Sequence, residues 1–389
     1  MAITDKEQGV WGLDQVYNKI NQGSIWEYTG LRELWAWGEN GGNMILGTDD
    51  ETQYSSPKQI PGTIWKIKSF NADGAADQSF AIRTDGTMWT WGNGTTGRQG
   101  QNNTTQYKSP RQLGTETTWG FVVSGNASSM ATKTDGTLWI WGSNSDGQLG
   151  QNSPGPSQRS SPIQIPGTTW DYSAYDKISM GSQTGYGIKT DGTLWGWGNG
   201  GMGQLGQNNT TTYSSPIQIG TDTTWNSVAM GYQSGAGIKT DGTLWVWGEN
   251  GDGRLAINNN TNYSSPIQVP GTTWKHCQLT NRLGIATKTD GTLWVWGDNA
   301  KGNLGQNNTT NYSSPKQIPG TDWNYASVGS GRHIVASQTN GELWACGSNN
   351  NGQLGQNSKV DYSSPVQIPG TTWERVVAQN SSSWGIRFL

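Results

Sequence analysis

The sequence has few of the residues from which disulfide frameworks and metal centres are built. Its 389 residues include only two cysteines, Cys277 and Cys346, and two histidines, His276 and His333. Two cysteines are too few for a disulfide scaffold, so we expect two reduced, packed thiols. The histidines stand in different repeats without an acidic or cysteine cluster at ligand spacing, and a zinc site takes about four ligands. We therefore expect no metal and no cofactor.

Charge and long apolar runs are also scarce. Lys and Arg total 25 against 28 Asp and Glu, and the formal net charge is −3. This balance does not attract a phosphate backbone, so we expect no nucleic-acid partner. No stretch approaches the ~18 consecutive apolar residues of a spanning helix, so we expect no membrane insertion. The opening residues, MAITDKEQGVWG, lack the basic segment and apolar run of a secretory signal peptide.

Motifs of common enzyme classes are missing. No G-x-S-x-G elbow follows a strand and opens a helix, and there is no G-x-x-x-x-G-K loop. Nothing in the sequence supports catalysis. We predict a protein that is not an enzyme and has no catalytic residues.

Glycine and tryptophan are abundant instead. The chain has 57 Gly and 23 Trp. Aliphatic residues are scarce, so we expect a core built largely from indole rings, each of which needs a partner for its N–H group.

A tryptophan-rich phrase, W-x-W-G, recurs about every fifty residues. Such a period is typical of repeat architectures. The last copy replaces the second Trp by Cys346. The first Trp of the phrase falls at Trp35, Trp89, Trp139, Trp195, Trp245, Trp294 and Trp344.

Each unit has the parts of four short strands. A strand-like segment such as GAGIKT meets Asp241-Gly242 and then TLWVWG, and two β-rich runs joined by Asp-Gly are the strongest short hairpin signal. A Gly- and Asn-rich loop, a strand of the type SSPIQIPG and a strand after a third Trp follow. Four strands per unit and seven units predict an all-β, seven-bladed β-propeller.

The chain ends predict how the ring closes. Only the first unit lacks the strand and turn before its phrase, and the missing strand is present at the other end as WGIRFL, residues 384–389. We therefore expect the C-terminal strand to pair with the segment around Trp35 in the first blade. An open solenoid would instead need polar caps at both ends. The predicted domains are an N-terminal arm at residues 1–30 and the propeller at residues 31–389.

The units resemble the repeats of the regulator of chromosome condensation family. The matching residues are the D-G-x-L-W-x-W-G core, the G-Q-L-G at residues 147–150, 203–206 and 352–355, and the downstream S-P-x-Q-I. The resemblance implies a seven-bladed propeller and, in the eukaryotic founder, chromatin binding and nucleotide exchange on a small GTPase. The family also has a His seven residues before the Asp, which only His333 matches. There is no basic tail and no large insertion, so we expect another role here. The equivalent places hold Gln78, Ser128, Thr184, Ser234 and Leu283.

The N-terminal arm has an apolar stripe that fits a short amphipathic helix, with residues at i, i+3, i+4 and i+7. Two interpretations stay open: the arm covers a face or edge of the propeller, or it docks on another protein. The lead-in GVWGLDQVY resembles short segments in structural proteins of tailed bacteriophages. The predicted anchoring residues are Trp11, Leu13, Val16, Tyr17, Ile20 and Trp26.

Two charged positions recur in the units. The Asp of Asp-Gly stands at a hairpin tip, which gives a sufficient backbone reason for its recurrence. The cations before it are expected to form a solvated or paired face, with an anion-binding ring as the alternative. These cations are Arg83, Lys133, Lys189, Lys239 and Lys288.

The polar loops are the strongest signal for binding, because loops on a rigid scaffold are where recognition usually lies. Segments such as GQNNTTTYSSP offer rings for stacking on sugars and amides for binding hydroxyls; alternatively, they are solubilising connections between strands. The candidate binding residues are Tyr213, Tyr263, Tyr312 and Tyr362.

These observations lead to one functional prediction and two alternatives. We predict a non-enzymatic virion protein of a tailed bacteriophage, a tail or head appendage present in several copies. Residues 1–30 would contact other virion proteins, and the propeller would contact a host-surface glycan or protein. The first alternative is a protein-interaction scaffold in the bacterial cytoplasm, and the second is a polysaccharide-active enzyme.

Overall fold

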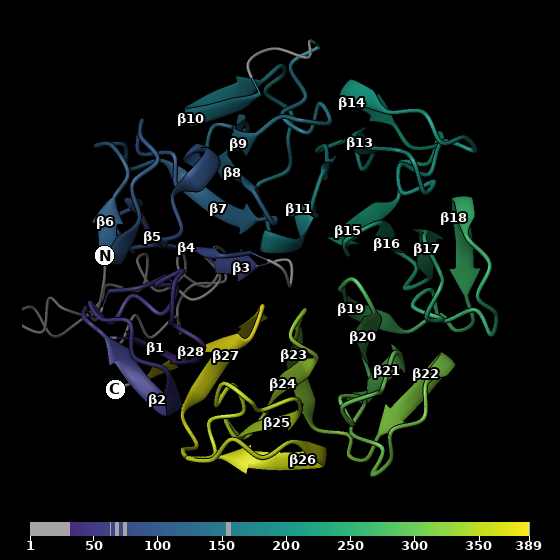
Figure 1. Cartoon of the computed structure of the whole chain (residues 1–389). Helices are drawn as coiled ribbons and strands as arrows, with labels where there is room; N and C mark the ends of the chain where they lie inside the picture. The colour runs from purple at the N-terminus through teal and green to yellow at the C-terminus, as the bar shows by residue number, and fades with distance from the viewer. Residues whose placement is uncertain (1–31, 63, 67–69, 73–75, 153–156, 389) are drawn as a thin grey trace, which may run out of the picture.

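The protein is a ring of β-sheets around a central axis (Figure 1). The computed structural model describes residues 32–388 except 63, 67–69, 73–75 and 153–156. The strands of this described part form seven sheets. We call them blades 1 to 7, in the order of the W-x-W-G phrases. The predicted seven-bladed β-propeller is confirmed.

Five blades are four-stranded antiparallel sheets, and blades 2 and 3 differ from them. Blade 1 consists of β27 (Trp373–Gln379), β28 (Ser382–Phe388), β1 (Arg32–Gly38) and β2 (Tyr54–Ile60). Blade 4 consists of β11 (Ile178–Met180), β12 (Thr184–Ile188), β13 (Leu194–Gly198) and β14 (Tyr213–Gln218). Blade 5 consists of β15 (Trp225–Met230), β16 (Ser234–Lys239), β17 (Leu244–Gly248) and β18 (Tyr263–Val269). Blade 6 consists of β19 (Trp274–Leu279), β20 (Leu283–Lys288), β21 (Leu293–Gly297) and β22 (Tyr312–Ile318). Blade 7 consists of β23 (Trp323–Gly329), β24 (His333–Gln338), β25 (Leu343–Gly347) and β26 (Tyr362–Ile368).

Blades 2 and 3 depart from the predicted four strands per unit. Blade 2 has β4 (Gln78–Ile82), β5 (Met88–Gly92) and β6 (Tyr107–Gln112). Blade 3 has β7 (Trp119–Ser124), β8 (Ser128–Lys133), β9 (Leu138–Ser143) and β10 (Gln158–Ile165), and β3 (Phe70–Ala72) pairs with β7 in parallel. Trp65, where the inner strand of blade 2 was expected, forms an isolated bridge with Arg83. The segment between these two residues is longer than its counterpart in blade 5, which lets β3 reach the neighbouring blade.

The ring closes through strands from both ends of the described chain. β1 and β28 pair antiparallel along their whole length, from Arg32 opposite Phe388 to Gly38 opposite Ser382. The Arg32 guanidinium also forms an ion pair of 2.8 Å with Glu374 on β27. The predicted closure by the C-terminal strand is confirmed, and blade 1 is built half from each end.

The second Trp of each phrase joins neighbouring blades. Its buried indole N–H donates to a backbone carbonyl in the Gly-rich loop of the preceding blade, as Trp197 does to Gln148 (2.9 Å) and Trp37 does to Gln353 (2.8 Å). The Trp37 bond crosses the closure of the ring. In blade 7 the Cys346 thiol takes this place and lies 3.6 Å from the Asn303 carbonyl oxygen. Because a buried indole needs a partner for its N–H, these bonds fix the loops against the next blade.

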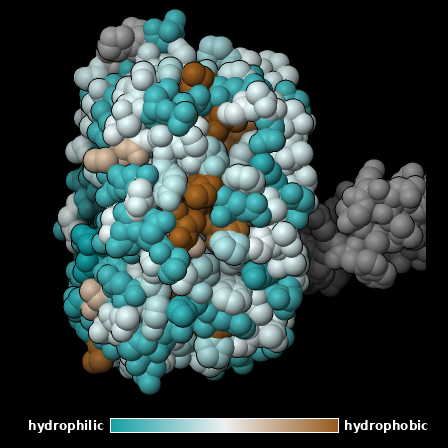
Figure 2. Space-filling model, turned by 90° about the vertical axis from the view of Figure 1, so that its right-hand side faces the viewer, coloured by the Kyte–Doolittle hydropathy of each residue, from teal (hydrophilic) through white to brown (hydrophobic). Residues whose placement is uncertain are grey.

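The outer surface of the ring over β14 and β18 is mainly polar (Figure 2). Figure 2, which shows the side over β14 and β18, has hydrophobic residues in a few small areas between hydrophilic ones. The outermost strands explain this pattern, because all six residues of β14 are only half-buried. In the described part of the chain, no helix is both long and apolar enough to cross a bilayer. The predicted arm, residues 1–30 with its anchoring residues, lies outside the described residues.

Candidate interaction surface

The repeated Asp-Gly turn holds the first Trp of the phrase in place. In blade 5 the Asp241 carboxylate accepts from the Thr243 N–H (2.9 Å) and hydroxyl (2.7 Å), and the Thr243 hydroxyl accepts from Trp245 Nε1 (2.9 Å). Gly242 has a φ of +78°, which favours glycine. The same chain of bonds recurs in blades 2, 3, 4 and 6. The recurring Asp therefore has the turn-forming role that its position predicted.

These bonds also act on the carboxylates. Hydrogen bonds from the Thr193 hydroxyl and N–H hold the pKa of Asp191 below its ordinary value, and Thr292 does the same for the pKa of Asp290. Both groups therefore stay ionised well below neutral pH, and proton exchange at neutral pH is not their role.

The repeated cation lies over two indole rings of its own blade. In blade 5 the Lys239 ammonium is 4.1 Å from the Trp245 ring centroid and 5.0 Å from that of Trp225. We call such a set of two tryptophans and one cation a clamp. A cation over an indole face is stabilised by the ring quadrupole. The five cations singled out in the sequence thus pack against aromatic rings, and Lys133 and Lys239 also pair with a carboxylate. The other clamps are Arg83 with Trp65 and Trp89, Lys133 with Trp119 and Trp139, Lys189 with Trp170 and Trp195, Lys288 with Trp274 and Trp294, and Arg387 with Trp35 and Trp373.

The clamps lie on one face of the ring, because each is built at the same hairpin of its blade. The first tryptophans are half-buried and the third tryptophans are buried. Arg387, the sixth cation, was not recognised in the sequence because the unit to which it belongs is split between the two chain ends. Its place two residues after Gly385, in WGIRFL, matches that of Lys239 after Gly237 in GAGIKT and is the signal that would have found it.

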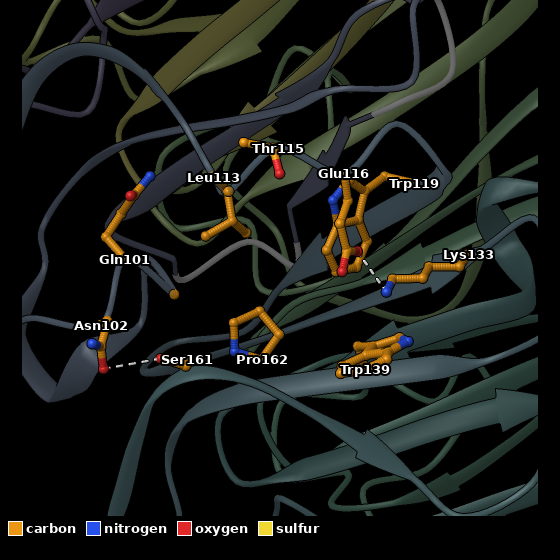
Figure 3. A pocket seen from close by; sticks show the side chains of 12 residues that line it. Gln101, Asn102, Leu113, Thr115, Glu116, Trp119, Lys133, Trp139, Ser161 and Pro162 are labelled. Carbon is orange, nitrogen blue, oxygen red and sulfur yellow. Dashed lines mark hydrogen bonds and ion pairs between the residues drawn. The ribbon is translucent and has the colours of Figure 1, made fainter.

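A groove of about 470 Å³ opens beside the clamp of blade 3 (Figure 3). Leu113 and Pro162 line its apolar part, and Glu116 and Lys133 form an ion pair of 2.5 Å at one side. On the opposite side the Asn102 amide oxygen accepts from the Ser161 hydroxyl (3.1 Å), which joins two neighbouring blades. Grooves with aromatic walls and a few polar groups are suited to binding.

The four candidate tyrosines do not come together. Tyr213, Tyr263, Tyr312 and Tyr362 begin the outermost strands of blades 4, 5, 6 and 7, and each is half-buried. In three of them the hydroxyl accepts from an Asn amide of the same loop, at 3.1 to 3.4 Å. Each tyrosine also packs against the core of its blade region. Their part in sugar binding stays a prediction, and any such sites would be separate.

A buried cluster at the axis was not recognised in the sequence. Arg375 on β27 stacks on Tyr325 of β23 (4.3 Å) and on Tyr175 of the short 3-10 helix η3 (Tyr175–Lys177) at 3.8 Å, and it donates to the Tyr325 hydroxyl (3.1 Å). The His276 ring lies 4.5 Å from that of Tyr325. The longer segment between Trp170 and the next Asp-Gly turn supplies η3 and is the signal in the sequence.

The histidines and cysteines are buried among packed side chains. Burial lowers the pKa of His276 to about 3 and the pKa of His333 to about 4. Burial also raises the pKa of the Cys346 thiol to about 12 and raises the pKa of the Cys277 thiol. At neutral pH the imidazoles are therefore neutral and the thiols protonated. Within the described ranges, no three His, Cys, Asp or Glu residues gather as a metal site would require.

Comparison with known proteins gives the family. Residues 33–385 match the model of the RCC1-like domain. Human WBSCR16 has a similar structure, with a TM-score of 0.78 and 18% identity over 92% of this chain and 99% of that chain. Prp20p from Saccharomyces cerevisiae is also similar, with a TM-score of 0.78 and 17% identity over 92% of each chain. The same yeast protein bound to Kap60 gives 0.77 and 17% over 93% of this chain and 91% of that chain.

No curated protein sequence matches the chain significantly. The family match covers nearly all of the described blades, from β1 to β28, and the solved structures share the ring of blades at low sequence identity. The chain belongs to the RCC1-like domain family.

Proposed function

We propose that this chain is a non-enzymatic binding protein whose propeller presents a rigid contact surface. One observation supports this most: the ionisable groups that recur in the repeat are used to build the blades. The aspartates cap turns, the cations lie over tryptophans, and both histidines and both cysteines are buried. The surface offers a face of half-buried indoles, a groove and polar loops, which are features of recognition.

The relatives fit this proposal in outline. Yeast Prp20p has binding properties to Gsp1p and histones, and a crystal structure shows Kap60 bound to it. At sequence identities of 17% to 18%, these structures share the fold with this chain, and its partner can differ from theirs. Its net charge of −3 does not favour a nucleic-acid partner.

We further propose that the propeller is displayed on the virion of a tailed bacteriophage, as a tail or head appendage that contacts the host surface or another protein. Two observations support this. The arm sequence resembles segments of phage structural proteins, and parts of the blades are nearly identical in sequence, as in SSPIQIPG and SSPKQIPG. Residues 1–30 would then join the propeller to other virion proteins.

Four measurements test this proposal. Immunoblotting of purified particles should detect the chain, and a variant without residues 1–30 should fold but be absent from particles. Labelled full-length chain should bind whole host cells, while sugar release from isolated envelope should stay at background. Detection in the host cytoplasm alone would favour the intracellular scaffold instead, and release of sugars would favour a polysaccharide-active enzyme.

A further inference from the structure

Blade 7 has the two tryptophans of the clamp but no cation of its own. Gln338 stands opposite Trp323, in the register that places Lys288 opposite Trp274 and Arg387 opposite Trp373. Trp344 packs against the cluster that contains Trp323. Among the described residues, blade 7 is therefore the blade in which a neutral side chain replaces the cation.

Blade 1 shows how a guanidinium is held when a Glu precedes the first Trp. Glu33 lies two residues before Trp35 and accepts from Trp35 Nε1 (3.0 Å). The Arg387 Nε lies 3.3 Å from the same carboxylate, and its guanidinium is 4.6 Å from the Trp35 ring centroid. A carboxylate, an indole face and a guanidinium thus form one set of contacts in this blade. This combination suits arginine, whose planar cation stacks on aromatic rings and pairs with carboxylates.

Blade 7 has the acidic residue of that set in its sequence, without the carboxylate–indole hydrogen bond of blade 1. Glu342 lies two residues before Trp344, where five other blades have a Thr that accepts from the indole. Trp344 Nε1 is buried and has no hydrogen-bond partner within the described chain. Asp322, an exposed residue directly before Trp323, lies at the same turn, where its backbone carbonyl accepts from the Thr339 N–H (2.9 Å). Blade 7 therefore has two acidic residues at the hairpin of its two tryptophans and no cation, whereas the clamps of the other six blades each contain one.

We propose that the clamp of blade 7 binds an arginine side chain of a partner protein. The guanidinium takes the place that Arg387 occupies in blade 1, over Trp344 and against the Glu342 carboxylate. The site is accessible from the face of the ring on which the clamps lie, because its three residues are only half-buried: Gln338, Glu342 and Trp344. This inference rests on the proposed binding function and adds to it the chemistry of the partner group.

The test uses N-acetyl-arginine amide with the full-length, ¹⁵N-labelled chain. The indole N–H signal of Trp344, identified as the one missing in Trp344→Phe, should shift and saturate at millimolar probe. The isosteric neutral probe, N-acetyl-citrulline amide, should leave it unshifted. Gln338→Lys gives the blade its own cation, as in blades 3 to 6, and should weaken arginine binding by about tenfold or more. Glu342→Thr, which restores the common residue, should weaken binding to a similar extent.

Three results would overturn the inference: no shift of the Trp344 signal, an equal shift with the neutral probe, or unchanged arginine binding in Gln338→Lys. Folding is checked separately, because Gln338→Lys should melt at a temperature no lower than that of the unaltered chain. The wider proposal has its own readout. If Gln338→Lys enters particles and binds host cells like the unaltered chain, the arginine site is wrong as the contact while the binding function stands.

Discussion

The buried histidines predict how the stability of the ring depends on pH. His333 begins β24 and is fully buried, with its Nε2 3.0 Å from the Ser383 hydroxyl of blade 1. Burial lowers its pKa from 6.5 to about 4. Between pH 6.5 and 4 the unfolded chain therefore binds a proton at this histidine that the folded chain does not. The free energy of unfolding keeps its full value above pH 6.5 and falls as the pH drops towards 4.

The size of the effect follows from this shift. Below pH 6.5 the free energy of unfolding should fall by about 1.4 kcal/mol per pH unit for one such histidine, or about 2 kcal/mol by pH 5. The test compares the unaltered chain with His333→Ser, because blade 5 has Ser234 at this position. Urea unfolding of both proteins is followed by tryptophan fluorescence between pH 5 and 7.5.

Loss of the packed imidazole lowers the free energy of unfolding of His333→Ser by a similar amount at every pH. Loss of the titrating group, in contrast, changes how steeply that free energy depends on pH. The difference in unfolding free energy between the two proteins should therefore shrink by about 2 kcal/mol from pH 7 to pH 5. Parallel curves would refute the reasoning, because they would mean that His333 takes up a proton equally in the folded and unfolded chains.

Three further predictions concern the blades, each checked by urea unfolding at pH 7. Thr243→Val removes the hydroxyl that accepts from Trp245 and should cost about 1 to 2 kcal/mol; an unchanged free energy would contradict the turn network. Lys239→Gln reproduces the neutral residue of blade 7 and should cost about 1 kcal/mol, unless the cation adds nothing to the clamp. Gly291→Ala should cost about 2 kcal/mol or more, because Gly291 has a φ of +78° and a Cβ would overlap the Thr321 carbonyl. The control, Gly41→Ala, has open space and should be nearly neutral. Equal effects of the two substitutions would contradict this reasoning.

The fold was predictable from the sequence because each blade is specified locally. The Asp241-Gly242 turn and the alternation around Trp245 determine one hairpin, and six further near-copies determine the ring. The closure followed from WGIRFL, which completes the unit that begins at β1. The position of β3 did not follow, because a parallel pairing with the next blade depends on contacts far apart in the chain.

The candidate site was predictable only in part. The repeated cations were visible, but a pattern of alternation does not show that Lys239 lies over Trp225, since that contact joins the first and second strands of the blade. The difference at Gln338 gains meaning only once the register with Trp323 is known. The axial cluster of Arg375 and Tyr175 joins blades 1 and 4, which no local pattern indicates.

The most direct test of the closed ring is a disulfide between its two ends. Glu33 and Arg387 lie opposite each other on β1 and β28, and their side chains form an ion pair of 3.3 Å. Directly opposed residues have Cβ atoms about 4.5 to 5.5 Å apart, close to the reach of a disulfide. The control pairs Glu33→Cys with Lys288→Cys, which places the second thiol at the matching position of blade 6. The native thiols of Cys277 and Cys346 are buried and so do not compete for oxidation in the folded protein.

After mild oxidation of the folded, full-length Glu33→Cys/Arg387→Cys protein, mass spectrometry of its digest should find the two peptides linked within one chain. The control should stay unlinked. A folded protein in which residues 33 and 387 do not link, or link only between two chains, would contradict the closed ring.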